Sequence, residues 1–303
     1  MPLKLTNGKK KIIINHIFLK EVFLMYKIVK KEVLNPTVTK MEILAPAVAK
    51  KAEPGQFIIL RVSDDGERIP LTVADYDREK GLVTIIFQIV GAATIELNTK
   101  KEGDFIADFV GPLGKASELS GLKKVAVVGG GVGCAIAYPV AKKLHELGAT
   151  VHSVVGFRNR DLIILEKEFS AVSDEMAIMT DDGSYGEKGL VTDALKKLIE
   201  SGNSYDEVIV IGPVIMMKFV SLLTKEYGIK TIVSMNPIMI DGTGMCGGCR
   251  LTVGGKTKFA CVDGPDFDGH EVDFDEAMRR SSIYKPFEKK AYDEACNLFK
   301  GVE

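Results

Sequence analysis

The hydrophobic pattern changes its period part-way along the chain. From about residue 25 to 115, apolar and polar positions alternate in short stretches, which turn signals such as Asn35-Pro36 and Pro54-Gly55 separate. The stretches are VTKMEIL (38–44), FIILRV (57–62) and GLVTIIFQIV (81–90). Short β-rich segments at this spacing predict a small antiparallel barrel or sandwich.

Beyond about residue 120, apolar strand-like stretches alternate with helical ones. We predict strands at 123–128, 150–157, 206–213 and 231–235, and helices at 134–147, 190–202 and 217–228. Gly148 fits the position just after the first helix, and Thr192 fits the N-cap of the second. Strands that alternate with helices predict a parallel α/β sheet. The remainder carries cysteines, an acidic glycine-containing loop (263–275) and a terminal helix.

Length agrees with this division, because 303 residues at about 150 per domain suggest two domains. The predicted parts are an N-terminal extension (1–24), a barrel (25–118), an α/β domain (119–235) and a C-terminal segment (236–303). An ordinary first strand or helix is the alternative interpretation of residues 1–24.

Charge and hydropathy exclude two classes of partner. The chain has 40 Lys+Arg against 41 Asp+Glu, and this balance argues against nucleic acid, which favours a basic excess. The longest uncharged stretch, Val125–Ala141, contains four glycines and a proline and is shorter than the usual span of about 20 apolar residues. Asn15 and His16 interrupt the apolar run near the amino terminus, so we expect neither a membrane helix nor an export signal.

Three of the five cysteines, Cys246, Cys249 and Cys261, are close together in the sequence. An odd cysteine count in a chain of this length is not typical of a secreted disulfide framework, and the grouping indicates a metal site in a reducing compartment. With Asp241 the spacing is D-x4-C-x2-C-x11-C. Plant-type [2Fe–2S] proteins use C-x4-C-x2-C and a distant cysteine, so Asp241 stands at the first ligand position. A carboxylate is anionic and hard, which suits ferric iron.

A zinc site is the competing interpretation of this group, with Asp241 or His270 completing the three cysteines. The iron–sulfur spacing is the better match, since it differs from the plant-type [2Fe–2S] pattern only by an aspartate in place of the first cysteine. Cys134 and Cys296 are isolated, and we interpret both as packing residues.

A glycine-rich loop, VAVVGGGVGCAIA (125–137), joins a predicted strand to a helix. Glycine lets the backbone approach a pyrophosphate, and the helix amino terminus offers free N–H groups to the negative charge. The G-x-G-x-G spacing differs from the standard fingerprint, so a tight packing turn is the alternative. Gly212-Pro213 forms a second turn at the same carboxyl edge of the sheet, where ligands of open α/β sheets bind, and strengthens the prediction of a nucleotide site.

The segment Arg68-Ile69-Pro70-Leu71-Thr72 is by itself a weak signal, compatible with a surface arginine on a loop and an ordinary strand threonine. GPLG (111–114) resembles a turn that ends the barrel. Together, however, R-x-P-L-T, GPLG, GGGVG and a late cysteine loop resemble the ferredoxin–NADP reductase superfamily. Over about residues 25–303, the chain resembles dihydroorotate dehydrogenase type B electron-transfer subunits. More closely, it resembles small subunits of NADH-dependent reduced ferredoxin:NADP⁺ oxidoreductases.

The resemblance implies an antiparallel β-barrel FAD domain, a parallel-sheet NAD-binding domain and a C-terminal [2Fe–2S] segment. In the FAD domain it places Arg68 near the pyrophosphate and Thr72 near the flavin edge, with Pro70 and Leu71 where the family often has an aromatic residue. Further flavin-phosphate positions are Gly91, Thr94 and Gly114.

For the nicotinamide nucleotide, the resemblance implies Gly129, Gly130, Gly131 and Gly133 of the glycine loop, Asp182 in the bordering segment TDDGS, and the turn Gly212-Pro213. The implied cluster ligands are Asp241, Cys246, Cys249 and Cys261, and an aspartate at the first position is the form expected in the bifurcating oxidoreductases.

The implied function is a cytoplasmic oxidoreductase subunit that passes electrons between NAD(H), FAD and a [2Fe–2S] cluster. Its expected partner is a larger flavin and iron–sulfur subunit that handles NADP(H) and ferredoxin in electron bifurcation. Hydride transfer needs no nucleophile–base–acid trio, and the sequence offers none. The alternatives are a dihydroorotate dehydrogenase electron-transfer subunit and, in a different class, a zinc-containing redox sensor.

Overall fold

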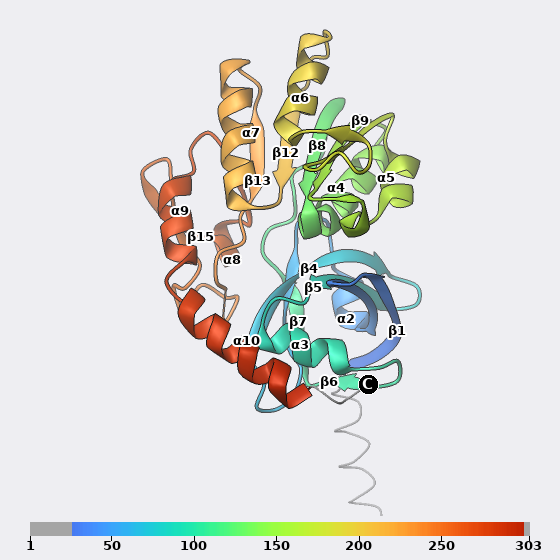
Figure 1. Cartoon of the computed structure of the whole chain (residues 1–303), viewed down its shortest axis with the longest axis vertical. Coiled ribbons are helices and arrows are strands. Elements are labelled where there is room, and N and C mark those ends of the chain that lie inside the picture. The colour runs from blue at the N-terminus through green and yellow to red at the C-terminus, as the bar shows by residue number, and fades with distance from the viewer. Residues whose placement is uncertain (1–25, 300–303) are drawn as a thin grey trace, which may run out of the picture.

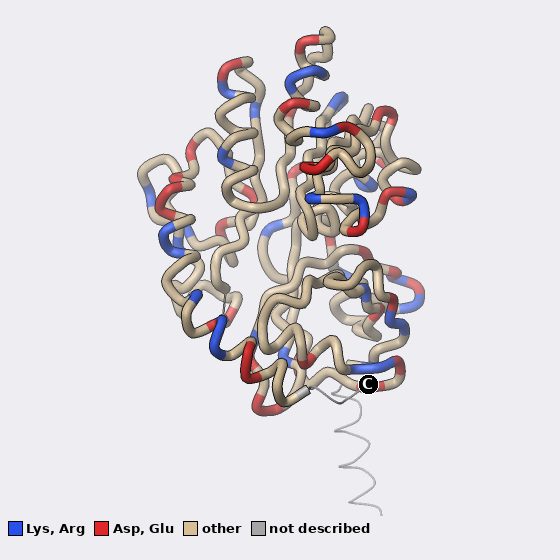
Figure 2. Tube along the Cα trace, in the orientation of Figure 1, with Lys and Arg blue, Asp and Glu red and all other residues tan. Residues whose placement is uncertain are grey.

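The computed structural model describes residues 26–299, and the predicted extension at 1–24 lies outside them. A β-barrel lies below a parallel sheet in Figure 1, and a C-terminal segment runs down one side of both. Acidic and basic residues are interspersed over all of these parts (Figure 2), as the near-zero net charge leads one to expect. No helix within the described residues is long and apolar enough to cross a membrane.

The lower sheet has seven antiparallel strands in the order β6-β1-β2-β5-β4-β3-β7 and curls into a nearly closed barrel. Its strands are β1 (Tyr26–Asn35), β2 (Val38–Leu44), β3 (Phe57–Arg61), β4 (Arg68–Asp77), β5 (Leu82–Gln88), β6 (Phe105–Ile106) and β7 (Asp108–Leu113), with helices α2 (Pro46–Ala49) and α3 (Ala92–Thr99). Apolar and polar residues alternate along these strands, so one face of the sheet is buried in the barrel. In β2, Met41 and Ile43 are fully buried, whereas Glu42 between them is only partly covered. The predicted antiparallel barrel is confirmed.

The upper sheet has the order β11-β10-β9-β8-β12-β13-β16, and every pair is parallel except β13 with β16. Its elements are β8 (Lys124–Gly130), η1 (Gly131–Gly133), α4 (Cys134–Glu146), β9 (Thr150–Phe157), η2 (Arg160–Leu162), α5 (Glu166–Val172), β10 (Glu175–Thr180), β11 (Glu187–Lys188), α6 (Val191–Glu200), β12 (Glu207–Ile211), α7 (Val214–Glu226) and β13 (Thr231–Ser234). Helix α4 packs into one hydrophobic core and helices α6 and α7 into another, so the sheet is covered on both faces. The predicted parallel α/β sheet is also confirmed.

The C-terminal segment joins both sheets. It consists of the hairpin β14 (Arg250–Val253) and β15 (Lys256–Phe259), α8 (Ala260–Asp263), β16 (Asp266–Asp268), α9 (Phe274–Ser281) and α10 (Lys285–Phe299). Strand β16 adds to the edge strand β13, pairing Asp266 with Ser234. Helix α10 then crosses to the barrel and packs beside α3 (Figure 1).

The barrel and the parallel sheet also contact each other directly. Val38 and Ala74 of the barrel are buried in the same core as the α4 face of the upper sheet. Beside this apolar contact, Lys142 Nζ of α4 lies 2.9 and 3.0 Å from the two carboxylate oxygens of Asp75 in β4.

Four local predictions are wrong. Thr192 is not an N-cap: α6 begins at Val191, and the Asp193 carboxylate accepts the Leu190 N–H at 2.9 Å, so the cap lies two residues earlier. GPLG is not simply a turn, because Gly111 to Leu113 continue β7 beside β3, and Arg68 lies within β4 and not on a loop. The acidic loop (263–275) contains β16 and the start of α9, since its backbone finds partners on β13 that local sequence does not reveal.

Candidate functional site

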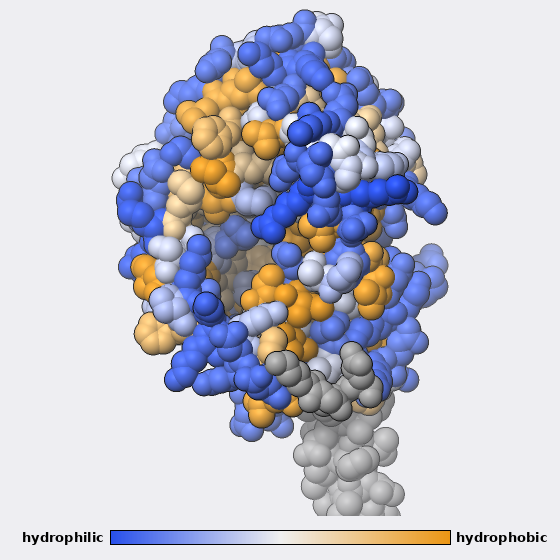
Figure 3. Space-filling model, in the orientation of Figure 1, coloured by the Kyte–Doolittle hydropathy of each residue, from blue (hydrophilic) through white to orange (hydrophobic). Residues whose placement is uncertain are grey.

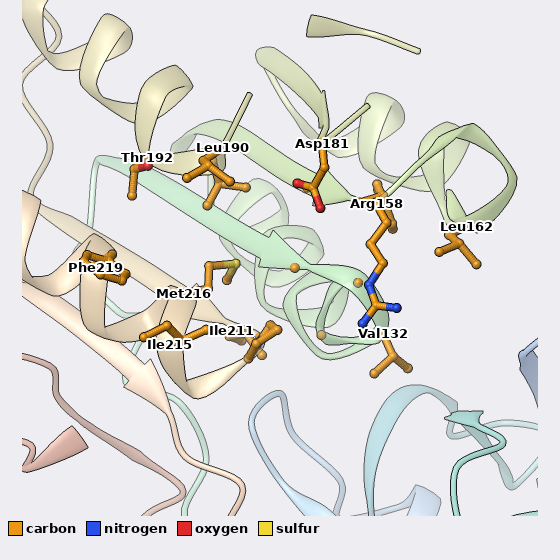
Figure 4. Close-up of a pocket in the computed structure, with 18 of the residues that line it drawn as sticks. Val132, Arg158, Leu162, Asp181, Leu190, Thr192, Ile211, Ile215, Met216 and Phe219 are labelled. Carbon is orange, nitrogen blue, oxygen red and sulfur yellow. The ribbon is translucent and has the colours of Figure 1, made fainter. Parts of the chain in front are cut away.

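A cavity of about 950 Å³ opens at the carboxyl edge of the parallel sheet. Its lining combines the glycine loop, the turn after β12, the β9 and β10 strand ends, one face of α7, and barrel residues from the β1–β2 turn. In Figure 4, Arg158 extends across the cavity toward Val132, and the Asp181 carboxylate faces the same space. Apolar side chains of α7, among them Ile215 and Phe219, line another wall and form part of the apolar patch at the upper left of Figure 3.

Two glycine turns pack against each other at this edge without room for side chains. A Cβ on Gly133 would lie 2.6 Å from the Ile211 carbonyl oxygen and 2.7 Å from Gly212 Cα, both of them backbone atoms. Gly131 has a φ of +54° and open space where a Cβ would be. The loop therefore presents bare backbone and the amino end of α4 to the cavity, an arrangement suited to a pyrophosphate.

The cavity contains most of the predicted nucleotide residues but not all of them. Gly130, Gly131, Gly133, Gly212 and Pro213 line it. Gly129 belongs to β8 and faces Cys134, which is fully buried as a packing residue.

Of the two adjacent aspartates, the one that lines the cavity is Asp181, the neighbour of the residue singled out from the sequence. Asp182 instead accepts the N–H of Ser184 at 2.9 Å, and the Ser184 hydroxyl, followed by this N–H, lowers the pKa of the Asp182 carboxyl. Arg158 is the one basic residue among the described lining residues. The adjacent pair Asp181-Asp182 carries no sequence signal that tells which carboxylate faces inward.

The predicted flavin residues gather on the barrel, outside the cavity lining. Thr72 pairs with Phe57 of β3, and Leu113 of β7 pairs with Phe57 from the other side, so Thr72 and Gly114 flank one strand. Pro70 pairs with Ile59 and Leu71 with Ile58. Arg68 lies at the opposite end of β4 from Asp77 and is exposed.

Two further predicted flavin residues, Gly91 and Thr94, lie at the start of helix α3, where Gly91 is the N-cap. The Thr94 hydroxyl accepts the N–H groups of Val90 and Gly91 at 3.0 and 2.9 Å, so it caps the helix. A capped helix start is suited to bind a phosphate.

The four predicted cluster ligands form two pairs. Cys246 Sγ lies 3.4 Å from Asp241 Oδ1, and Cys249 Sγ lies 3.2 Å from Cys261 Sγ. The first pair is in the exposed loop after β13, and the second is buried where β14 begins and α8 follows β15. Two thiolates on one tetrahedral metal at about 2.3 Å are about 3.8 Å apart, so small shifts of each pair would admit an iron.

Local contacts set the charge of these ligands. Burial, and then the neighbouring Cys249 thiol, raise the pKa of Cys261 to about 12. Burial opposes ionisation of Asp241 as well, but hydrogen bonds from Thr243 and Cys246 prevail and lower the pKa of its carboxyl to about 2. Asp241 is therefore an anion ready to bind, whereas the Cys261 thiol needs a cation to hold it as thiolate.

The cluster loop rests against the barrel. A Cβ on Gly242 would lie 2.7 Å from Leu113 Cδ1 and 2.9 Å from Ile59 Cγ1, so the glycine, with a φ of +77°, allows close contact with β7 and β3. Arg68 Nε donates to the Ile240 carbonyl at 3.3 Å. The loop that carries the predicted cluster ligands thus touches the strands that carry the predicted flavin residues.

Comparison with known proteins agrees with this geometry. Residues 236–273 match the model of the iron–sulfur cluster binding domain of dihydroorotate dehydrogenase B. A dihydroorotate dehydrogenase B (NAD⁺) electron transfer subunit homolog of Thermotoga maritima is 50% identical over 267 residues, which are 88% of this chain and 94% of the relative. The chain belongs to the dihydroorotate dehydrogenase B electron-transfer subunit family. The electron transfer subunit of Fusobacterium nucleatum is 34% identical, over 73% of this chain and 87% of its own.

Two solved structures are similar to this family member. A chain from the structure of NADH-dependent reduced ferredoxin–NADP oxidoreductase, described for flavin-based electron bifurcation, is 49% identical and has a TM-score of 0.85. The match covers 89% of this chain and 97% of that one. The ferredoxin reductase of carbazole 1,9a-dioxygenase, at 18% identity and a TM-score of 0.58, shares the fold. The predicted resemblance is confirmed.

The donor set of this electron-transfer subunit fits a two-iron cluster better than a single zinc ion. Within residues 26–299, no three His, Cys, Asp or Glu side chains converge as one metal would require. Two separate pairs are what a centre with two metals needs, since each iron takes two protein ligands. His270 bonds instead to Thr224 Oγ1 at 3.1 Å.

Proposed function

We propose that the chain is the electron-transfer subunit of a larger oxidoreductase and exchanges electrons between NAD(H) and a second, larger subunit through FAD and a [2Fe–2S] cluster. The observation that carries this proposal is the paired donor set, Asp241 with Cys246 and Cys249 with Cys261, in a loop that packs on the barrel. Bound FAD would convert between the hydride of a nicotinamide and the single electrons of the cluster. Free thiols at the second pair favour a reducing, cytoplasmic compartment.

On the barrel, the chain's task is to bind and orient the flavin. We assign Arg68 and the first N–H groups of α3 to the pyrophosphate, with Gly91 providing the approach and Thr94 holding the helix start in place. Pro70, Leu71 and Thr72 provide the strand beside the ring, and Gly114 allows close backbone approach at the end of β7. A φ of +75° at Gly114 favours glycine there.

In the cavity, the chain's task is to place a nicotinamide nucleotide against the barrel. We assign the bare backbone of Gly130 to Gly133, with Gly212 and Pro213, to the pyrophosphate. The barrel contributes Asn35 and Thr37 to the same cavity, so one ligand can contact both sheets. The apolar side chains of α7 give the cavity one wall that leaves little room for water beside a bound nucleotide.

The finer proposal is the small subunit of NADH-dependent reduced ferredoxin:NADP⁺ oxidoreductase. High identity over nearly the whole length of a chain of that enzyme supports it. Asp241 at the first ligand position supports it as well. The partner would be a larger flavin and iron–sulfur subunit, through which ferredoxin and NADP(H) react. A dihydroorotate dehydrogenase subunit is the second candidate, favoured by the matched cluster-domain model and the Fusobacterium relative.

Anaerobic co-purification from the native host tests both proposals. The complex should show flavin absorption and a reduced-cluster signal in electron paramagnetic resonance after NADH is added. Activity with NADPH and ferredoxin supports the finer proposal, and activity with dihydroorotate replaces it with the second candidate. A colourless zinc protein would overturn the whole proposal.

The ligand assignment of Asp241 has a separate test. Asp241→Cys should keep the cluster but lower its potential and change its spectrum, because a thiolate donates more charge to iron than a carboxylate does. Asp263→Cys is the matched control, since Asp263 bonds to the Phe259 N–H at 2.8 Å in the neighbouring helix α8. An unchanged spectrum and potential in Asp241→Cys would exclude Asp241 as a ligand.

A further inference from the structure

A buried carboxyl group lies where the barrel, the parallel sheet and the cluster segment meet. Asp266 opens β16, and its Oδ2 accepts the Ser117 hydroxyl at 2.5 Å. Ser117 belongs to the connection from the barrel to the parallel sheet. Asp266 is also paired in register with Ser234 at the end of β13, and the nearby Ser234 hydroxyl favours the charged form of the same carboxyl and so lowers its pKa.

Each of these contacts is a few residues from a predicted binding position. Ser117 is three residues beyond Gly114 of the barrel, and Ser234 lines the nucleotide cavity. Asp266 itself is five residues beyond the cluster ligand Cys261. Chain tethers of this length leave little freedom, because each residue spans at most about 3.5 Å.

Backbone hydrogen bonds reinforce the same junction. Lys115 N–H donates to the Gly264 carbonyl at 2.7 Å, and Met235 N–H donates to the Pro265 carbonyl at 2.9 Å. Both acceptors directly precede Asp266 in the chain. The cluster segment is therefore tied to the other two parts by backbone hydrogen bonds immediately before this one side chain.

Burial of this carboxyl group is energetically unfavourable, because its hydrogen bonding is incomplete. Oδ1 is buried and has no hydrogen-bond partner among the described residues. Burial raises the pKa of Asp266, against the effect of the two serine hydroxyls. Gly55, with a φ of +85°, leaves the space that the Ser117 hydroxyl fills, and a Cβ there would lie 3.3 Å from Asp266 Oδ2. Buried, incompletely bonded groups are rare, so this one calls for a role.

We propose that Asp266 is a positioning residue that holds the cluster loop at a fixed place relative to the flavin and nucleotide sites, because its carboxylate binds the Ser117 hydroxyl while its strand pairs with Ser234 of β13. This role rests on the proposed function. It predicts that transfer between flavin and cluster depends on Asp266 more than hydride transfer does, because the glycine turns and the barrel strands keep their own contacts. Misplacing reacting groups by 1 Å costs on the order of 100-fold in rate.

Stopped-flow reduction of the anaerobic holo-complex by NADH separates the two steps. In Asp266→Ala, flavin reduction should stay within about twofold of wild type, while cluster reduction slows by about tenfold or more. Asp266→Asn should keep a rate close to that of wild type, because the amide carbonyl oxygen can still accept the Ser117 hydroxyl. Asp268→Ala is the matched control on the same strand, since the Asp268 carboxylate is exposed and accepts the His270 N–H.

A second readout needs no cofactor. Hydrogen–deuterium exchange of the apoprotein should be about tenfold faster at the Lys115 and Met235 amides in Asp266→Ala, and unchanged there in Asp268→Ala. Equal slowing of both redox steps, or unchanged exchange and unchanged rates, would overturn the positioning role. Failure of the wild-type cluster to accept electrons from NADH would instead contradict the proposed function.

Discussion

Replacing Gly133 with alanine tests whether the two glycine turns form the nucleotide site. The new methyl group would lie 2.6 Å from the Ile211 carbonyl oxygen, whereas ordinary contacts begin near 3.4 Å, so the turns must separate by about 0.8 Å. The obstacle is backbone on both sides, which no side-chain rotation relieves. Overpacking of this kind costs about 1–3 kcal/mol. The same shift moves the loop amides away from a bound pyrophosphate, and we expect NADH affinity to fall about tenfold, or about 1.4 kcal/mol.

The assay is titration of NADH by its own fluorescence, with thermal unfolding of the same samples as a measure of stability. Gly148→Ala is the matched control: Gly148 has a φ of +82° at the end of α4, no atom lies within 4 Å of its missing Cβ, and it is remote from the cavity lining. That variant should lose about 1–2 kcal/mol of stability through backbone strain and keep its NADH affinity. If Gly133→Ala binds NADH as tightly as wild type, the packed turns are not the nucleotide site.

Three further changes probe the parts around the site. Thr94→Val removes the cap of α3 and should cost about 1 kcal/mol and weaken FAD binding, measured by flavin release on dilution; Thr99→Val, at the other end of the helix, should leave FAD affinity unchanged. Lys142→Met breaks the pair with Asp75, which is partly exposed, and should lower stability by about 1 kcal/mol or less; a loss that does not shrink at high salt would contradict the ionic explanation. Burial, and then Lys124, lower the pKa of His152, so the unfolded chain takes up the proton first and stability should fall as pH drops below about 6.5. His152→Gln should flatten this slope in melting temperatures measured between pH 7.5 and 5.5, and an unchanged slope would point to another group.

The alternating strands and helices of the parallel sheet were predictable, because the apolar pattern and the glycines that mark them lie within each element. Strand β9 is found at the predicted 150–157, and α4 ends one residue before the predicted 134–147, with Gly148 in the left-handed conformation just beyond. Burial on both faces makes such strands continuously apolar, and glycine marks the helix end. The spacing of the cysteines was also informative, since Cys246 to Cys261 all lie in the matched cluster-domain region.

Other features depend on contacts between distant residues. Strand β16 is short and acidic, and it becomes a strand because β13 offers it an open edge. The choice between Asp181 and Asp182 depends on a turn in which Ser184 donates to Asp182. The contact of Asp266 with Ser117 joins residues 149 positions apart, beyond any pattern in a local window.

The antiparallel strand β16 has a consequence for biogenesis. An uncovered strand edge exposes unpaired N–H and C=O groups and invites aggregation, and β16 covers that edge of β13. Ribosomes synthesise β16 after the cysteine loop. The β13 edge of the nascent parallel sheet therefore stays unpaired until residues 266–268 have left the ribosome. Truncation after Met235 should therefore yield an aggregating sheet and not merely a cluster-free protein. We therefore expect the pairing of β16 with β13 and the folding of the cysteine loop against the barrel to occur together.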